Sequence, residues 1–517
     1  EGARCFARAH EQFEERNDLA GLLLAWSGAV DAIWQQQQDW SQLDPWIGRL
    51  EARLQRGKVF PSDQVAARVV SSLFWILVWR CPTHPQMARW AGEAARLWER
   101  TDEFSIRLRL GVGLCTYYIL VGEAARFRAL GETQLQLAGR KGILPDAALL
   151  AHMMSIYVST YGGHYQEASD RARSAFEVAS VSGIRVFDCL LYGAALYPAL
   201  GNEDFATADE LLNSMSAILS ALPTNLDTSH HELHRGWRAR LAGDSRRAVQ
   251  HAESAVEIAS RIGAYYPEIM CRYGLAHAYL ANGDLANAQR ENDVARAKAQ
   301  VAGFNWWLYL CGLFEAYLAF ERADETLGAE RLRDALALQA RFDIGYLLPL
   351  WSKTMIARLC VKAFEHDIAT TYVRNLLRMH RLHAADPPLH LENWPWPIKI
   401  HTLGRFAVLL DDRPLTFAAK TQKKPLELLK ALAALGGSDV SDSQLIECLW
   451  PDADGDRGHH ALEMALSRLR KLLGNPEAIL AQGRNLSLNE HYIWVDVRSL
   501  AQVLDRLETA LRQDASN

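Results

Sequence analysis

Residues 454–474 read DGDRGHHALEMALSRLRKLLG, and their spacing predicts one amphipathic helix. Leucines recur at three- and four-residue steps and so form one apolar stripe, at Leu462, Leu466, Leu469 and Leu473. The other surface carries hydrogen-bonding and charged groups, at His459, His460, Glu463, Ser467, Arg468, Arg470 and Lys471. Such a surface suits the major groove of DNA, where Arg, His and Ser reach base edges and phosphates. Taken alone, the pattern is equally typical of a surface helix with solvated charges.

The flanking segments predict a small α+β domain around this helix. Residues 398–410 alternate as IKIHTLGRFAVLL, and a turn at 411–414 follows, which is typical of a small antiparallel sheet. Helices are expected at 422–435 and 441–450, and a hairpin with its tip at 483–485 follows the central helix. The order of strands, three helices and hairpin is that of a winged helix-turn-helix.

Three segments of this domain resemble a known family. They are LGRFAVLLDDRPLTF at 403–417, LIECLWPDADGD at 445–456 and HALEMALSRLRKLLG at 460–474. They are similar to the OmpR-type winged helix, and more closely to its version in SARP-type regulators and in large ATP-dependent, MalT-like regulators. The resemblance implies DNA binding through the helix at 458–473 and the wing at Arg484. It also implies an ATP-binding switch domain ahead of residue 1 in the intact protein.

The residue types at this site predict particular DNA contacts. Phosphate contacts are expected from Lys420, Lys423, Lys424 and Arg484. Groove contacts are expected from His459, His460, Glu463, Ser467 and Arg468, and backbone contacts at the helix end from Arg470 and Lys471. Arg457 belongs to the same predicted interface, whereas Glu463 stands where the family commonly has an amide. The net charge of −5 counts against a global attraction to DNA, but this domain is locally basic.

Glycines recur every 38 to 42 residues in the first part of the chain, at Gly122, Gly163, Gly201, Gly243 and Gly283. Four of the five are followed 20 residues later by a second glycine. A turn that starts one helix and a glycine that caps it predict helical hairpins stacked into a solenoid. The phrases resemble tetratricopeptide (TPR) repeats in the long form of MalT-like regulators.

The predicted fold class is therefore mainly α, a TPR-like α-hairpin solenoid followed by a small α+β winged helix-turn-helix domain. The solenoid is expected at 1–383, a Pro-rich linker at 384–397, the winged helix at 398–500 and a C-terminal helix or tail at 501–517.

A solenoid offers a concave face for peptides, helices or small effectors. Aromatic residues early in the second helices of successive repeats form a candidate effector wall, at Tyr265, Tyr266, Trp306, Trp307 and Tyr309. The alternative, that large residues fill the core between helices, is their commoner use. For the cluster His230, His231 and His234, a solvated helix start is favoured over a zinc or effector site.

No phosphate-binding G-x-x-x-x-G-K-[ST] motif, G-x-S-x-G elbow or other catalytic constellation occurs, so we expect no enzyme activity, cofactor or metal. The eight cysteines are scattered without C-x-x-C, which favours free thiols in the cytoplasm. The longest apolar run, 73–79, is far too short to span a membrane.

The sequence thus predicts a cytoplasmic transcriptional regulator, expected to be an activator. Its partners would be double-stranded promoter DNA, RNA polymerase and an effector or protein on the solenoid, and a dimer on DNA fits paired half-sites. The alternative is a protein-interaction scaffold in which the winged helix serves protein contacts. The acidic net charge and Glu463 support that alternative.

Overall fold

The computed structural model describes residues 1–55, 60–140, 142–415 and 423–514. The chain forms two compact units, Glu1–Met355 and Ile356–Asn517, which we call the helical unit and the C-terminal unit. The division lies ahead of the predicted linker at 384–397, so the C-terminal unit contains helices that the sequence placed in the solenoid.

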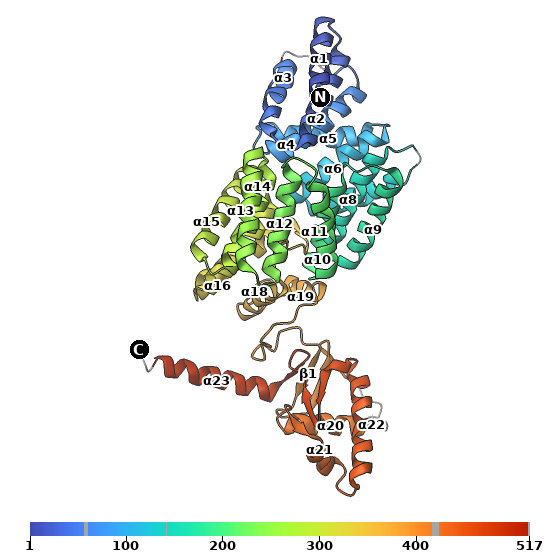
Figure 1. Cartoon of the computed structure of the whole chain (residues 1–517). Helices are drawn as coiled ribbons and strands as arrows, with labels where there is room; N and C mark the ends of the chain where they lie inside the picture. Colours follow the sequence, from blue (N-terminus) through green and yellow to red (C-terminus); the bar gives the residue numbers. More distant parts are fainter. Residues whose placement is uncertain (56–59, 141, 416–422, 515–517) are drawn as a thin grey trace. The chain divides into compact units, whose positions relative to one another are not determined.

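The described part of the helical unit consists of helices joined by short turns (Figure 1). They are α1 (Gly2–Glu15), α2 (Leu19–Gln36), the 3-10 helix η1 (Trp40–Leu43), α3 (Asp44–Gln55), α4 (Asp63–Arg80), α5 (Met87–Arg100), α6 (Phe104–Val121), α7 (Ala124–Ala138), α8 (Pro145–Tyr161), α9 (Tyr165–Ser182), α10 (Asp188–Gly201), α11 (Phe205–Leu219), α12 (Leu226–Leu241), α13 (Ser245–Ile262), α14 (Tyr265–Ala281), α15 (Leu285–Ala302), α16 (Asn305–Glu321) and α17 (Glu325–Phe342).

Local capping chemistry defines where these helices begin and end. The side chain of an aspartate accepts a hydrogen bond from the backbone N–H three residues ahead at Asp204, Asp244, Asp284 and Asp324. Gly263 and Gly303 close α13 and α15 in the left-handed conformation, with φ of 78° and 69°. Buried alanines such as Ala248 and Ala288 allow neighbouring helices to approach closely. This helical-hairpin solenoid confirms the repeat pattern predicted from the glycines.

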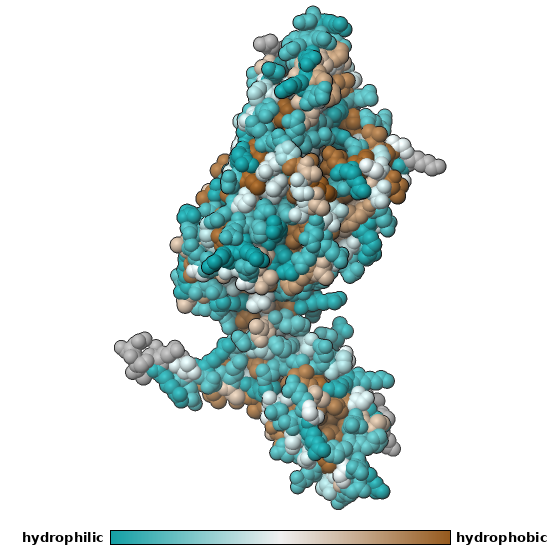
Figure 2. Space-filling model, in the orientation of Figure 1, coloured by the Kyte–Doolittle hydropathy of each residue, from teal (hydrophilic) through white to brown (hydrophobic). Residues whose placement is uncertain are grey.

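The solenoid curls until remote repeats touch. Helix α4 packs against α14, and α6 packs against α16. Hydrogen bonds join the same regions, from Arg80 Nη1 to the Gly263 carbonyl at 2.7 Å and from Asn305 Nδ2 to the Val121 carbonyl at 2.8 Å. The even-numbered helices α2 to α16 therefore face a common interior. On the face shown in Figure 2, hydrophilic residues predominate over the helical unit.

Helix α6 is the one helix among the described residues with the length and hydropathy to cross a membrane. Most of that span is buried by neighbouring helices, which is typical of a core helix in a folded domain.

The C-terminal unit combines helices with two small sheets. Its described elements are most of α18 (Lys353–Glu365), α19 (Thr370–Met379), β1 (Ile398–His401), β2 (Ala407–Leu410), β3 (Arg413–Pro414), α20 (Lys423–Ala434), β4 (Val440–Ser441), α21 (Asp442–Leu449), α22 (Gly455–Leu473), the 3-10 helix η2 (Pro476–Ala478), β5 (Ile479–Gln482), β6 (Asn485–Leu488), β7 (Ile493–Val495) and α23 (Asp496–Asp514). The predicted strands, three helices and hairpin are thus all present in order, and α23 runs through the predicted boundary at 500/501.

One sheet has the strand order β3-β2-β1-β7, and the other has the order β4-β6-β5. Strand β1 is antiparallel to β2, with Ile398 opposite Leu410, and parallel to β7, with Ile398 opposite Ile493. Leu428 and Leu432 of α20, Leu445 of α21 and the apolar face of α22 share one core with both sheets. The core therefore holds α22 against the rest of the unit along its leucine stripe.

The Pro-rich segment packs onto its neighbours within the C-terminal unit. Trp394 and Trp396 are buried, and the Trp394 ring lies 5.3 Å from that of Phe364 in α18. Trp396 Nε1 donates to the Leu391 carbonyl, and Trp494 Nε1 of β7 donates to the Leu389 carbonyl, both at 2.8 Å. These tryptophans join α18, the Pro-rich segment and the sheet into one compact unit.

Trp396→Ala should therefore destabilise the C-terminal unit. The side chain is only 2% exposed, so its removal leaves a cavity and should lower the free energy of unfolding by about 3–5 kcal/mol. Urea unfolding of the full chain, followed by tryptophan fluorescence, would measure the shift. Leu403→Ala, at a side chain that is 54% exposed, is the control and should change it by about 0.5 kcal/mol or less. Equal effects of the two substitutions would contradict the role of Trp396.

Candidate DNA interface and an aromatic cavity

Helix α22 has the two faces that its spacing predicted. The Asp454 carboxylate accepts from the Arg457 N–H at 3.0 Å and begins the helix, and Gly474 ends it with φ of 68°. Leu462, Ala465, Leu469 and Leu473 are buried, whereas Leu466 is half-buried against the same core. The exposed face presents His460, Glu463, Met464, Ser467, Arg468 and Lys471.

Met464 is an addition to the predicted interface. It lies between His460 and Arg468 in the exposed row, and its side chain is exposed to solvent. The sequence analysis made no prediction for Met464, and its four-residue step from His460 was the pattern that could have placed it on this face. An apolar side chain here can contact a thymine methyl group.

The lysines predicted to contact phosphates differ in whether their side chains already have close partners within the unit. Lys423 has an 81% exposed side chain and a distant partner, Glu427, at 3.9 Å. Lys424 instead donates from Nζ to the Leu449 carbonyl at 2.9 Å and pairs with Glu427 at 3.0 Å, which ties α20 to the end of α21. Lys420 lies outside the described residues.

Arg470, a predicted contact to the DNA backbone, already makes a hydrogen bond within the unit. It is only half-exposed, and its Nη2 donates to the Ile479 carbonyl at 2.7 Å. The guanidinium thus joins α22 to strand β5. The helical spacing placed Arg470 on the polar side of α22 but could not show that a later strand passes beside it.

The hairpin β5–β6 ends in a tight turn at Gly483, whose φ is 61°, and Arg484, whose side chain is exposed. The Asp442 N–H at the start of α21 donates to the Arg484 carbonyl at 2.8 Å. The Asp442 carboxylate also lies 3.4 Å from His459 Nδ1 of α22. Asp442 therefore brings the hairpin tip and the first turns of α22 together. The remaining predicted contact, Arg457, is exposed and pairs with Asp454 at 3.6 Å.

The helical unit holds a second candidate site, a cavity of about 90 Å³ among its inner helices. The wall includes Trp34 from α2, Trp75 and Trp79 from α4, Tyr266 from α14 and Trp306 from α16. Neighbouring rings touch along this wall, with the Trp34–Trp75 centroids 5.4 Å apart and the Trp79–Tyr266 centroids 5.2 Å apart. The cavity exists only because the solenoid brings early and late repeats together.

Some residues of the predicted aromatic wall line this cavity, and others lie in the core between helices. Tyr266 and Trp306 line the cavity. Trp307 and Tyr309 are fully buried between helices. They therefore follow the alternative interpretation, in which large residues fill the core. Tyr265 lies outside both, with its hydroxyl donating to the Lys298 carbonyl at 3.1 Å and Lys298 Nζ 4.4 Å from its ring. Trp34, Trp75 and Trp79 were not predicted, because no local pattern links these early repeats to the later ones.

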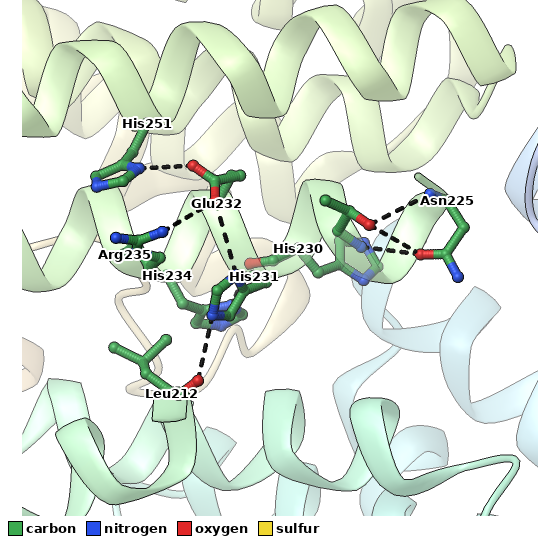
Figure 3. A network of polar contacts seen from close by, with 9 residues as sticks. Leu212, Asn225, His230, His231, Glu232, His234, Arg235 and His251 are labelled. Carbon is green, nitrogen blue, oxygen red and sulfur yellow. Dashed lines mark hydrogen bonds and ion pairs between the residues drawn. The ribbon is translucent and has the colours of Figure 1, made fainter. Parts of the chain in front are cut away.

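In the histidine cluster of α12, His231 and His234 are buried and His230 is half-buried, so the expectation of a solvated helix start is wrong. His230 and His234 line the cavity one turn apart. His231 is not among the residues that line the cavity, and its Nε2 donates to the Leu212 carbonyl at 3.2 Å, as Figure 3 shows. Glu232 faces His251 of α13, at 2.6 Å between Oε2 and Nδ1. Among the described residues, no group of His, Cys, Asp and Glu is arranged to hold a metal ion.

Asp227, at the start of α12, is a buried carboxyl group that is 7% exposed. The Gln37 side chain accepts from the Asp227 backbone N–H at 3.1 Å, and the Leu226 N–H donates to the Gln37 carbonyl at 3.0 Å. Burial raises the pKa of Asp227 to about 6, and the hydrogen bond from Gln37 only partly opposes this rise. The contacts join α2 to α12 beside the cavity.

Asp227→Asn should stabilise the helical unit at neutral pH. The folded pKa is about 6 against an ordinary 3.8, so the carboxylate costs nothing below pH 4, becomes increasingly unfavourable as pH rises to 6, and carries its full cost above that. The cost is roughly 3 kcal/mol at most, because one pKa unit corresponds to about 1.4 kcal/mol. Urea unfolding at pH 4 and pH 7.5 should show a gain for the variant only at pH 7.5.

Asp170→Asn, at an exposed residue of α9, is the control. It should change the free energy of unfolding by the same small amount at both pH values. A gain from Asp227→Asn that is equal at pH 4 and pH 7.5 would contradict the burial of the charge.

No protein-family model and no curated protein matches this sequence. Among solved structures, the chain is similar to the Rap protein complexed with Competence and Sporulation Factor, at 11% identity and a TM-score of 0.44, over 61% of this chain and 87% of that one. It is also similar to the STAND (Signal Transduction ATPase with Numerous Domains) protein with a tetratricopeptide repeat sensor from Pyrococcus horikoshii, at 11% identity and a TM-score of 0.34. That match covers 76% of this chain and about half, 54%, of the other.

A third similar structure is NprR in complex with its cognate peptide NprX, at 12% identity and a TM-score of 0.33, over 61% of this chain and 77% of that one. These similarities concern helical-repeat proteins that are too distant to assign a family or a ligand to this chain.

Proposed function

We propose that this chain is a sequence-specific DNA-binding transcription regulator without enzyme activity. Its C-terminal unit would read promoter DNA as a winged helix of the OmpR or SARP type, and its helical unit would sense an effector or a partner. The observation that carries the proposal is the exposed face of α22, where Arg468, Ser467 and His460 stand opposite a leucine stripe that packs against the core. A helix supported in this way can enter a major groove without exposing apolar residues of its own domain.

Other contacts support the same reading. Lys423 and Lys471 are exposed cations on α20 and α22, and Arg484 projects from a hairpin tip that Asp442 connects to α21. Backbone-contacting cations around a recognition helix set its register on the duplex, whereas the helix itself reads bases. Lys424 and Arg470 are left out of the proposed contacts, because each already donates to a backbone carbonyl.

The second candidate function is a protein-interaction scaffold. Glu463 in the middle of the exposed face of α22 and the net charge of −5 favour it, because both repel phosphate. The two functions differ in salt dependence. DNA binding must weaken steeply as salt rises, since phosphate contacts release counterions, whereas an apolar protein contact need not.

Selection of bound sequences from random duplexes, with the full chain, tests the proposal. We expect enrichment of one direct or inverted repeat over competitor DNA. If nothing is enriched, with or without added effector candidates, the regulator is excluded and the scaffold becomes the better account.

Two substitutions separate base reading from phosphate contact. Arg468→Ala should weaken binding to the selected site by about 1–3 kcal/mol and reduce the preference at one base position. Lys423→Ala should weaken all sequences about equally and lower the slope of log K against log salt by roughly 1. Titrations of labelled duplexes at several salt concentrations measure both effects.

Arg512→Ala, at an exposed residue of α23 outside the proposed interface, is the matched control and should leave binding unchanged. Equal loss for Arg468→Ala and Lys423→Ala, with an unchanged salt slope, would contradict the assigned roles.

A further inference from the structure

The cavity of the helical unit has a chemical character that restricts what it can bind. Among the described residues, its lining contains no Lys, Arg, Asp or Glu side chain, and aromatic and aliphatic groups make up most of its surface. The cavity has a volume of about 90 Å³. On the same measure, one water molecule needs roughly 10–15 Å³. The space therefore suits a molecule of one or two rings, whereas a folded peptide or an oligosaccharide is too large.

Unpaired donors belong to residues that line this apolar space. The indole Nε1 atoms of Trp34, Trp75, Trp79 and Trp306 are buried, and none has a hydrogen-bond partner among the described residues. An indole N–H can only donate, so each needs an acceptor. The edge-to-face ring contacts of Trp34 with Trp75 and of Trp79 with Tyr266 provide at most weak π acceptors. Four unpaired donors around one cavity are unusual for a buried apolar core.

Unpaired histidine nitrogens belong to the same wall, at Nε2 of His230 and of His234. His234 Nδ1 is 2.7 Å from the His230 carbonyl oxygen, and because a carbonyl only accepts, Nδ1 carries the proton. His234 Nε2 is then the lone-pair nitrogen of a neutral ring, and it is buried with no partner among the described residues. Burial lowers the pKa of His234 to about 4 and that of His230 to about 3, so both rings are neutral at pH 7.

A charged ligand would lose its hydration here without gaining a counter-ion. The wall is neutral, the histidines are neutral, and stacked aromatic rings such as Trp75 and Trp79 favour a flat, polarisable partner. The donor required by His234 Nε2 further restricts the molecule to one with an N–H or O–H group.

We infer that the cavity binds a neutral aromatic molecule of one or two rings that carries an N–H or O–H donor. Indole is the simplest probe, because its N–H can donate to His234 Nε2 while its π face can accept from indole N–H groups of the wall. That this molecule is the effector rests on the function proposed above, whereas binding itself does not. The ligand would contact α4 on one side and α12, α14 and α16 on the other. It would therefore bridge the early and late repeats whose contact closes the solenoid.

Gly193 of α10 provides a direct test of the site. It lines the cavity, and a Cβ atom built there meets nothing within 4 Å, so Gly193→Leu should place side-chain carbons in the cavity volume. Gly92 of α5 is the matched control, because it is also helical, its added Cβ also meets nothing, and it lies outside the cavity. Isothermal titration of the full chain with indole should give binding that Gly193→Leu weakens at least tenfold and Gly92→Leu leaves unchanged.

Ligand variation tests the chemistry. Benzofuran, which has the size of indole but no N–H, should bind about tenfold more weakly to the wild type, because His234 Nε2 is left unpaired. In His234→Phe this preference should disappear, and circular dichroism would confirm that the variant is folded. Benzoate, which is charged, should not bind to the cavity.

No binding of indole at millimolar concentration, equal binding to the wild type and Gly193→Leu, or benzoate binding that Gly193→Leu abolishes would each overturn the inference. The titrations contain no DNA. A failed DNA selection alongside Gly193-sensitive indole binding would therefore overturn the proposed function but not this site, and the reverse result would overturn the site alone.

Discussion

Contact between repeats that are far apart in the chain is the constraint on which the helical unit depends. The Arg80 guanidinium reaches the carbonyl of Gly263, and a Cβ at Gly263 would lie 2.5 Å from Arg80 Nη1. Asn305 similarly satisfies the carbonyl of Val121, the last residue of α6. A solenoid that stayed open would expose the aromatic residues of its inner helices to water. Because it closes, these residues become the wall of a shared cavity, and the cavity depends on the closure.

The C-terminal unit is organised by a different constraint, the burial of one leucine stripe. The core beneath α22 includes residues from both sheets and from α20 and α21. Two cations at the margins of this core stabilise the arrangement. Lys424 donates to a carbonyl at the end of α21, and Arg470 donates to a carbonyl of β5. His460, Ser467, Arg468 and Lys471 of α22, together with Lys423 and Arg484, keep exposed side chains that a partner can reach. Structural and functional charges in this unit thus come from neighbouring positions on the same helices.

Much of the fold followed from local patterns. Asp244 caps α13, Gly263 ends it, and the leucine stripe orients α22, because each effect involves residues within one or two helical turns. The candidate sites followed less well. The histidines of α12 were expected in solvent, and Trp34, Trp75 and Trp79 were not connected with Trp306. Periodicity reports which face of a helix is apolar, but a nearly all-apolar inner helix such as α4 has no such contrast.

By itself, the sequence determined the helical hairpins, their glycine and aspartate caps, the order of elements in the C-terminal unit and the two faces of α22. Capping and amphipathic spacing act over a few residues, and the chain carries that information directly. Only the tertiary structure decided which repeats meet, that His230 and His234 lie beside Trp79 and Tyr266, and that Arg470 binds a strand instead of solvent. Those outcomes depend on how small turns between successive hairpins add up over many repeats, and no local pattern contains that sum.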